Sequence, residues 1–436
     1  MSPVSRTRKT KKSKTSSGTR GAARRRTQAT LTGPPRSAFA AMQELLLGPR
    51  QRPAWFDPSI KTVLDGAGVV MAARGPRELE QVTAELLGAE LYHAVHEERE
   101  GMWFSWWFEE LTQAATARIR EELGNRDGGW VPPWRLLHGL TSIGSPALRS
   151  IAQKALRQAS QELRGDAALR EQPDWLRLLA RITATGEVWE MRDAYGARIA
   201  LIAGFSYPQG VDRSVFLFDI DACGFIEITH AGVFDDVAQA ATAWRALVGD
   251  TAQDSRLERV ETAERLRCLV HCDSEEEMLR GSESRAVLDN WFRARRRIYD
   301  LAEALRRRGL SLPMARSLYH DLDTDPMAKA FTSWHAQRHG SEPDPEVVDA
   351  LALEWMEGAL PDTWHAASPH RVDVQLALIN DWIPDDPITI AVKVLLPEWV
   401  RWHGEQADLP EHLIDRAVAV AAGGARAATD CPGRRV

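Results

Sequence analysis

The sequence has few cysteines, no long apolar run, and no acidic residue in its first 37 positions. Four cysteines in 436 residues cannot form the dense disulfide scaffold of a small secreted domain. No apolar segment approaches the roughly 18 residues that a membrane-spanning helix needs, so no membrane partner is expected. The arginines at 24–26 suggest a twin-arginine export signal, but the polar residues 27–37 lack the required apolar region. We therefore expect a protein of the reducing cytoplasm.

The charge is divided between two parts of the chain. Residues 1–37 hold eleven Lys and Arg and no Asp or Glu, whereas the remainder carries 44 basic against 61 acidic residues. The basic segment is too polar to order itself, and it can neutralise phosphates without choosing a sequence. We expect it to contact nucleic acid; the alternatives are a solubilising extension or residues added by an upstream start codon. The basic residues chosen as phosphate contacts are Lys9, Lys11, Lys12, Arg24, Arg25 and Arg26.

The period of the apolar residues predicts the fold class. Helical spacing dominates before residue 184 and after residue 253, whereas 186–234 holds short apolar runs separated by turn residues. These patterns predict an α+β, predominantly α-helical protein with a central four-stranded antiparallel meander. The expected parts are a disordered basic tail (1–37), a helical domain with one HEAT-like hairpin (38–183), the meander with a helix (184–252), a helical C-terminal bundle (253–422) and a frayed tail (423–436).

Sixteen tryptophans are an unusually large number for this length. They are spread from Trp55 to Trp402, so we expect them to stabilise helix packing along the whole body. The segment 103–108 carries aromatic residues at consecutive positions, which cannot share one helix face. Burial against protein on two sides is the favoured interpretation.

Three stretches carry a resemblance. EVWEMRDAYGARIALIAGFSY, VFLFDIDACGFIEITHAGVFDD and LLPEWVRWHGE resemble a group of uncharacterised proteins from high-GC actinobacteria, from about Pro173 onward. The resemblance implies no activity, cofactor or partner.

Asp219 and Asp221 follow an apolar strand, as the aspartate pair of haloacid-dehalogenase phosphotransferases does. In that motif the first Asp is the nucleophile and the second a general acid, both beside Mg²⁺. Here Ala222-Cys223 stands in place of Gly-Thr, and the next strand follows without a crossover helix. We expect solvated carboxylates on an edge strand. The alternative is a metal-dependent hydrolase or metal-binding protein that uses Asp219, Asp221 and His230.

Cys268 and Cys272 have helical i,i+4 spacing and form the one cysteine pair that could hold zinc together with Cys223. Structural zinc sites usually contain two such pairs, and the second is absent here. Buried cysteines acting as small apolar residues are therefore favoured. No cofactor is predicted.

The segment 291–322 has the pattern of a helix-turn-helix. An apolar-spaced helix over 284–308 ends before Gly309, and a polar helix is predicted over 312–322. Arg295, Arg296 and Arg297 are the candidate contacts to nucleic acid in this segment. The alternative is that they form an ordinary solvated helix surface.

No catalytic set of residues has both the right types and the right spacing. We therefore expect a non-enzymatic cytoplasmic interaction or regulatory protein, with a nucleic-acid or a protein partner. This expectation requires that the scattered polar groups do not converge into a reactive pocket.

Overall fold

The computed structural model describes residues 51–97, 103–123, 128–207, 213–224, 226–272, 284–310, 312, 318 and 322–427. The basic tail, with its six candidate phosphate contacts, lies outside the described residues. The chain divides into two units, Met1–Arg52 and Pro53–Val436, and every element below belongs to the second. Within the described part, no helix is both long enough and apolar enough to cross a lipid bilayer.

The first helices enclose an aromatic core. Trp107 is fully buried and stacks on Trp55, while Phe104 meets Trp55 edge to face. Phe104, Trp107 and Phe108 are buried, and Trp103 and Trp106 are partly buried against the same core. The elements are α3 (Phe56–Gly66), η1 (Ala67–Ala72), α4 (Pro76–His96), α5 (Phe104–Glu122), α6 (Val131–Ile143), α7 (Pro146–Glu162), α8 (Ala167–Arg170) and η2 (Asp174–Arg181).

α6 and α7 form a helical hairpin, and its likeness to a HEAT repeat stays a prediction. Gly144 and Ser145 separate the two helices, and Pro146 occupies the first turn of α7, where its missing N–H costs no hydrogen bond.

A five-stranded antiparallel sheet follows, in the order β4-β3-β2-β1-β5. Its strands are β1 (Thr183–Arg192), β2 (Arg198–Ser206), β3 (Arg213–Asp221), β4 (Glu227–Phe234) and β5 (Glu258–Arg259). The first four strands form the predicted meander. The two-residue β5 lies in the segment 253–422, which we expected to be helical, and η5 (Ala263–Leu266) and α10 (Arg267–His271) follow it.

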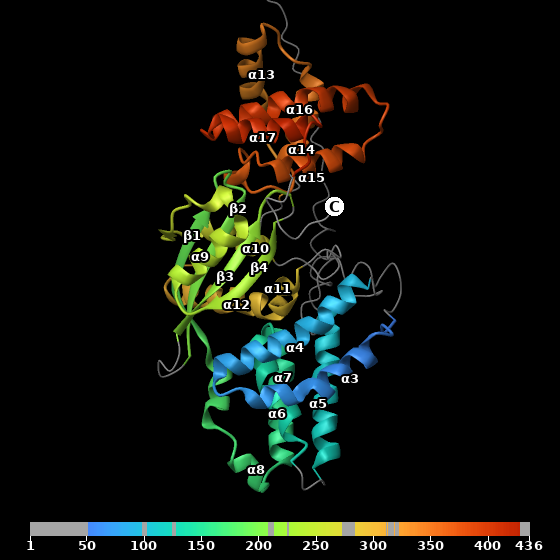
Figure 1. Ribbon diagram of the computed structural model, residues 1–436, viewed down its shortest axis with the longest axis vertical. Helices are drawn as coiled ribbons and strands as arrows, with labels where there is room; N and C mark the ends of the chain where they lie inside the picture. Colours follow the sequence, from blue (N-terminus) through green and yellow to red (C-terminus); the bar gives the residue numbers. More distant parts are fainter. Residues whose placement is uncertain are drawn as a thin grey trace, which may run out of the picture. The chain divides into compact units, whose positions relative to one another are not determined.

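Helices cover both faces of the sheet (Figure 1). α9 (Val237–Val248) places Trp244 against Ile202 and Leu217, and η4 (Asp250–Ala252) follows it. On the other face, α12 (Trp291–Arg307) places Leu301 against a separate apolar cluster of the strands. Because both faces are covered, β2 is buried along almost its whole length instead of alternating in burial.

α12 also belongs to the core of the N-terminal helices. Trp291 and Phe292 at its start pack with α5, whereas Leu301 and Leu305 pack with the sheet. The helix expected over 284–308 is divided at Asn290 into α11 (Arg285–Asp289) and α12. The Asn290 side-chain amide donates to the carbonyl oxygens of Ala231 and Ala286, which holds the break against β4.

The C-terminal helices form a third apolar core around Trp355, Trp399 and Trp402. They are α13 (Asp325–His339), α14 (Pro345–Met356), η7 (Pro361–Thr363), α15 (Pro369–Asn380), α16 (Pro387–Gln406) and α17 (Glu411–Ala421). The structure therefore confirms an α+β protein that is predominantly helical.

Candidate functional site

The end of the β3–β4 hairpin and the start of α15 bring together three side chains of the kinds that bind metals. Asp221 is the last residue of β3, Cys223 lies in the turn that follows, and His370 is the second residue of α15. One ligand atom from each of these residues lies within 4.8 Å of the other two. The described residues form no other such group of three.

One pair of these ligand atoms has the separation found on a tetrahedral metal ion. Asp221 Oδ2 lies 3.2 Å from His370 Nδ1. Two ligands that each lie about 2.0–2.1 Å from a tetrahedral zinc ion are about 3.3 Å apart, so this pair already has the separation required.

Local hydrogen bonds hold the carboxylate and the thiol in place. Asp221 Oδ1 accepts the backbone N–H of Cys223 at 2.8 Å, which directs Oδ2 towards His370. Ser368 caps α15, because its hydroxyl accepts the backbone N–H of Arg371 at 3.1 Å. The same hydroxyl lies 3.2 Å from Cys223 Sγ. The sulfur is thus tied to the first turn of α15.

The cluster is buried. Asp221 is 1% exposed, Cys223 is 4% exposed and the side chain of His370 is 12% exposed. An apolar group surrounds the sulfur; its other members are Tyr195, Ala197, Ala366 and Leu413, with Leu409 partly buried against them. A metal ion held here would therefore be shielded from water.

Positive charge lies close to the sulfur. Arg371 is buried and donates to the backbone carbonyl oxygens of Thr363, Ala366 and Trp355. Burial lowers the pKa of Arg371 to about 10, while the nearby Cys223 acts in the opposite direction. The attraction is mutual, so Arg371 stabilises negative charge on the sulfur, as does the N-terminal end of α15.

The expectation of solvated carboxylates on an edge strand is wrong, because Asp219 and Asp221 are both buried and β3 lies between β4 and β2. Asp219 has a structural role. It is fully buried and forms a two-pronged ion pair with Arg198, at 2.7 and 2.5 Å. It also accepts from Trp244 Nε1 at 2.9 Å and from Thr229 Oγ1 at 3.0 Å. With both oxygens occupied, Asp219 is not a free nucleophile.

The predicted set of Asp219, Asp221 and His230 is therefore divided. His230 pairs with Asp219 across the β3–β4 ladder, and burial lowers its pKa, but it does not belong to the metal-type cluster. Asp221 is the one member of the set that reaches that cluster.

The predicted zinc set of Cys223, Cys268 and Cys272 is also divided. Cys268 and Cys272 pack in the apolar core between the sheet and α12, whereas Cys223 lies in the cluster at the C-terminal helices. Burial raises the pKa of Cys268 to about 12, so it remains a thiol. The favoured interpretation of these two residues, as small buried apolar side chains, agrees with their placement.

The arginines of α12 are less exposed than expected. Arg296 and Arg297 are buried; Arg296 donates to Asp300 at 2.8 Å, and Arg297 forms an ion pair with Glu80 of α4. Both the expectation of a solvated surface and that of phosphate contacts need correction for these two residues. Arg295 is partly buried, with its guanidinium 3.7 Å from the centre of the Trp291 ring. Most of the predicted second helix, 312–322, lies outside the described residues.

His370 is not among the site residues predicted from the sequence. Its one local signal is the Ser368-Pro369 start of a helix, and this says nothing about a partner far away in the sequence. The pairing with Asp221 and Cys223 results from the docking of α15 against the hairpin. No family model, curated protein or solved structure matches this chain.

Proposed function

We propose that this protein binds a transition-metal ion of the zinc class through Asp221, Cys223 and His370, and that the ion fastens the β-sheet to the C-terminal helices. The observation that carries the proposal is the meeting of a carboxylate, a thiol and an imidazole within 4.8 Å. Thiolate, imidazole and carboxylate are the protein ligands that zinc takes.

The place of the cluster supports a structural role. Its ligands come from two parts of the fold, the β3–β4 hairpin and α15. Two further contacts join the sheet to the C-terminal helices, since Tyr195 after β1 donates to the carbonyl of Leu413 in α17 at 3.2 Å and Arg192 of β1 pairs with Asp362 of η7 at 2.6 Å. The turn is closely packed as well, because a Cβ on Gly224 would lie 2.9 Å from Val374 Cγ1. A bound ion would add a strong bond to this junction.

The burial of Cys223 indicates whether its sulfur serves as a metal ligand or as a nucleophile. Cysteine, histidine and aspartate also form nucleophilic triads, but a nucleophile must be partly exposed to meet its substrate. At 4% exposure within an apolar surround, the sulfur favours a ligand role. Three protein ligands leave a fourth position, which Ser368 Oγ or a water molecule would occupy.

Metal analysis of the purified full-length chain tests the proposal. We expect one zinc ion per chain, a thiolate-to-metal charge-transfer band after exchange for cobalt(II), and loss of both in Cys223→Ala and His370→Ala. Cys268→Ala is the matched control, since it removes a buried thiol outside the cluster and should leave the metal content unchanged. A folded wild-type chain that takes up neither zinc nor cobalt would refute the proposal.

A second proposal is carried by the charge of residues 1–37. Eleven basic residues and no acidic ones favour contact with a nucleic-acid backbone. This supports an interaction protein of the cytoplasm, whose reducing conditions would also keep a thiol ligand intact. Retention of the chain on duplex DNA should fall steeply with salt, and deleting residues 1–37 should abolish it. Equal retention of the shortened chain would rule out the tail as the contact.

A further inference from the structure

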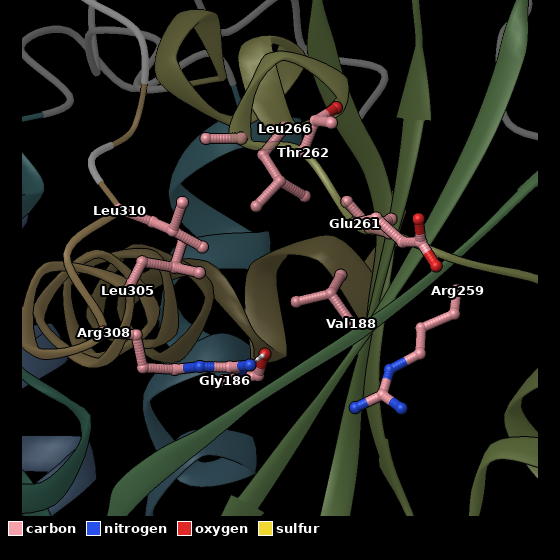
Figure 2. A pocket seen from close by; sticks show the side chains of 11 residues that line it. Gly186, Val188, Arg259, Glu261, Thr262, Leu266, Leu305, Arg308 and Leu310 are labelled. Carbon is pink, nitrogen blue, oxygen red and sulfur yellow. Dashed lines mark hydrogen bonds between the residues drawn. The ribbon is translucent and has the colours of Figure 1, made fainter.

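A concave site separate from the metal-type cluster lies where β1, β5 and the end of α12 meet (Figure 2). Its volume is about 270 Å³, close to the lower limit for small-molecule pockets. In liquid water this volume holds about nine molecules, so the cavity suits a ligand of about ten non-hydrogen atoms.

Three irregularities of the backbone create the cavity. β5 pairs with β1 at two positions, and its chain then turns away into η5. β1 is itself irregular between Ala184 and Val188, where Gly186 has a φ of +79°. α12 ends nearby, and Gly309 turns the chain with a φ of +75°. The sheet edge is therefore uncovered beside the helix end.

Apolar side chains form the interior. Val188 from β1, Leu266 from η5 and Leu305 from α12 line the cavity and are buried. Leu310 also lines it and remains 37% exposed, as one of the large apolar side chains on the surface. Figure 2 shows Leu266, Leu305, Leu310 and Val188 arranged around the same space. An apolar ligand would cover this exposed surface.

A fixed positive group lies along one side. Arg308 donates from Nη1 to the carbonyl of Gly186 at 2.7 Å, which anchors its guanidinium beside the cavity. Gly186 allows this approach, since a Cβ there would lie 2.8 Å from Arg308 Nη1. The second lining arginine, Arg259, is 58% exposed and lies 3.5 Å from a carboxylate oxygen of Glu187, and the carboxylate of Glu261 points away from the leucines in Figure 2. Arg308 therefore provides the positive charge beside the cavity.

From this combination we infer that the cavity binds a small apolar carboxylic acid, with the size and chemistry of an eight-carbon fatty acid. The hydrocarbon chain lies among Val188, Leu305 and Leu310, and the carboxylate meets Arg308. A guanidinium has five N–H donors, and its fork geometry suits a carboxylate. The inference does not depend on the metal proposal, because the two sites share no residue.

Calorimetric titration of the full chain with octanoate tests the inference. We expect saturable binding at one site, weakened at least fivefold by Arg308→Gln, which removes the charge but keeps a donor for the Gly186 carbonyl. Binding of the uncharged octan-1-ol should be the same in wild type and Arg308→Gln. Arg306→Gln is the matched control, because this exposed arginine pairs with Glu303 and does not line the cavity.

A second variant separates this site from unspecific adsorption. Ala263→Trp fills the cavity from a half-buried position and should abolish octanoate binding without lowering the unfolding temperature. Absence of saturable binding to the wild type, or undiminished binding to folded Ala263→Trp, would overturn the inference. Equal loss of octanoate and octan-1-ol in Arg308→Gln would overturn the role of the charge.

Discussion

Replacing Asp219 by alanine should destabilise the protein by a large fraction of its total stability. The substitution removes the two-pronged partner of the buried Arg198 and the acceptor of Trp244 Nε1. Thr229 Oγ1 loses its bond to the carboxylate but keeps the backbone carbonyl of residue 219 as an acceptor. Breaking one side of a buried ion pair costs about 3–5 kcal/mol. Each unsatisfied buried donor adds about 1–3 kcal/mol, although neighbouring losses add incompletely.

We therefore expect Asp219→Ala to lower the free energy of unfolding by about 4–6 kcal/mol. Complete domains are stable by only about 5–15 kcal/mol, so the variant should be close to unfolding at room temperature. Urea unfolding followed by tryptophan fluorescence measures the change, and Trp244 reports directly from the site. Asp235→Ala is the control, since Asp235 is exposed and pairs with Arg77 at the surface; its unfolding midpoint should not move measurably.

A double-mutant cycle tests the reasoning behind this magnitude. If the loss of the Arg198–Asp219 ion pair is the main cost, Arg198→Ala with Asp219→Ala should be much less destabilising than the sum of the two single variants. The expected coupling is at least about 2 kcal/mol. A single-variant loss below about 1 kcal/mol, or strict additivity in the double variant, would contradict this account of Asp219.

Two further predictions concern the other packed regions. His403 and His365 face each other in the C-terminal core, with 2.9 Å between their Nδ1 atoms, and burial lowers the pKa of both. The unfolded chain therefore binds more protons than the folded chain below about pH 6.5, so the free energy of unfolding should decrease as the pH is lowered through this range. His403→Phe should reduce the dependence of this free energy on pH by up to about 1.4 kcal/mol per pH unit, measured by urea unfolding. Gly88→Ala would place a Cβ 2.4 Å from the Asp289 backbone and should lower the melting temperature markedly. Gly68→Ala, with open space around it, should leave the melting temperature unchanged.

The meander could be predicted because its signals are local. Each of its strands is a short apolar run that ends in turn residues, such as 193–196 between β1 and β2. β5 could not be predicted because a strand of two residues is too short to show an alternating apolar pattern. Its position depends on pairing with β1, including the hydrogen bond from Val260 N to Val188 O. The break at Asn290 was missed for a similar reason, since the acceptor that holds its side chain is the carbonyl of Ala231 on β4.

The candidate site shows the same limit more strongly. The sequence could propose Asp221 and Cys223, since both lie in one hairpin, but not His370, which only the docking of α15 brings near them. Likewise, the arginine-rich pattern of α12 suggested a surface for phosphates. Arg297 instead neutralises Glu80, which lies 217 positions away in the sequence. Ion pairs between distant segments leave no periodic trace.

Because α12 contributes to two apolar cores, it limits where the chain can be shortened. Trp291 and Phe292 belong to the apolar core of the N-terminal helices, and Leu301 and Leu305 belong to the core on one face of the sheet. Removing α12 would therefore expose both cores. A fragment that stops before residue 284 would leave apolar side chains of the helices that precede the sheet, and of the strands themselves, open to water. Such a fragment should aggregate on expression. Shortening from the C-terminal side should be tolerated only where the cut falls beyond Arg307.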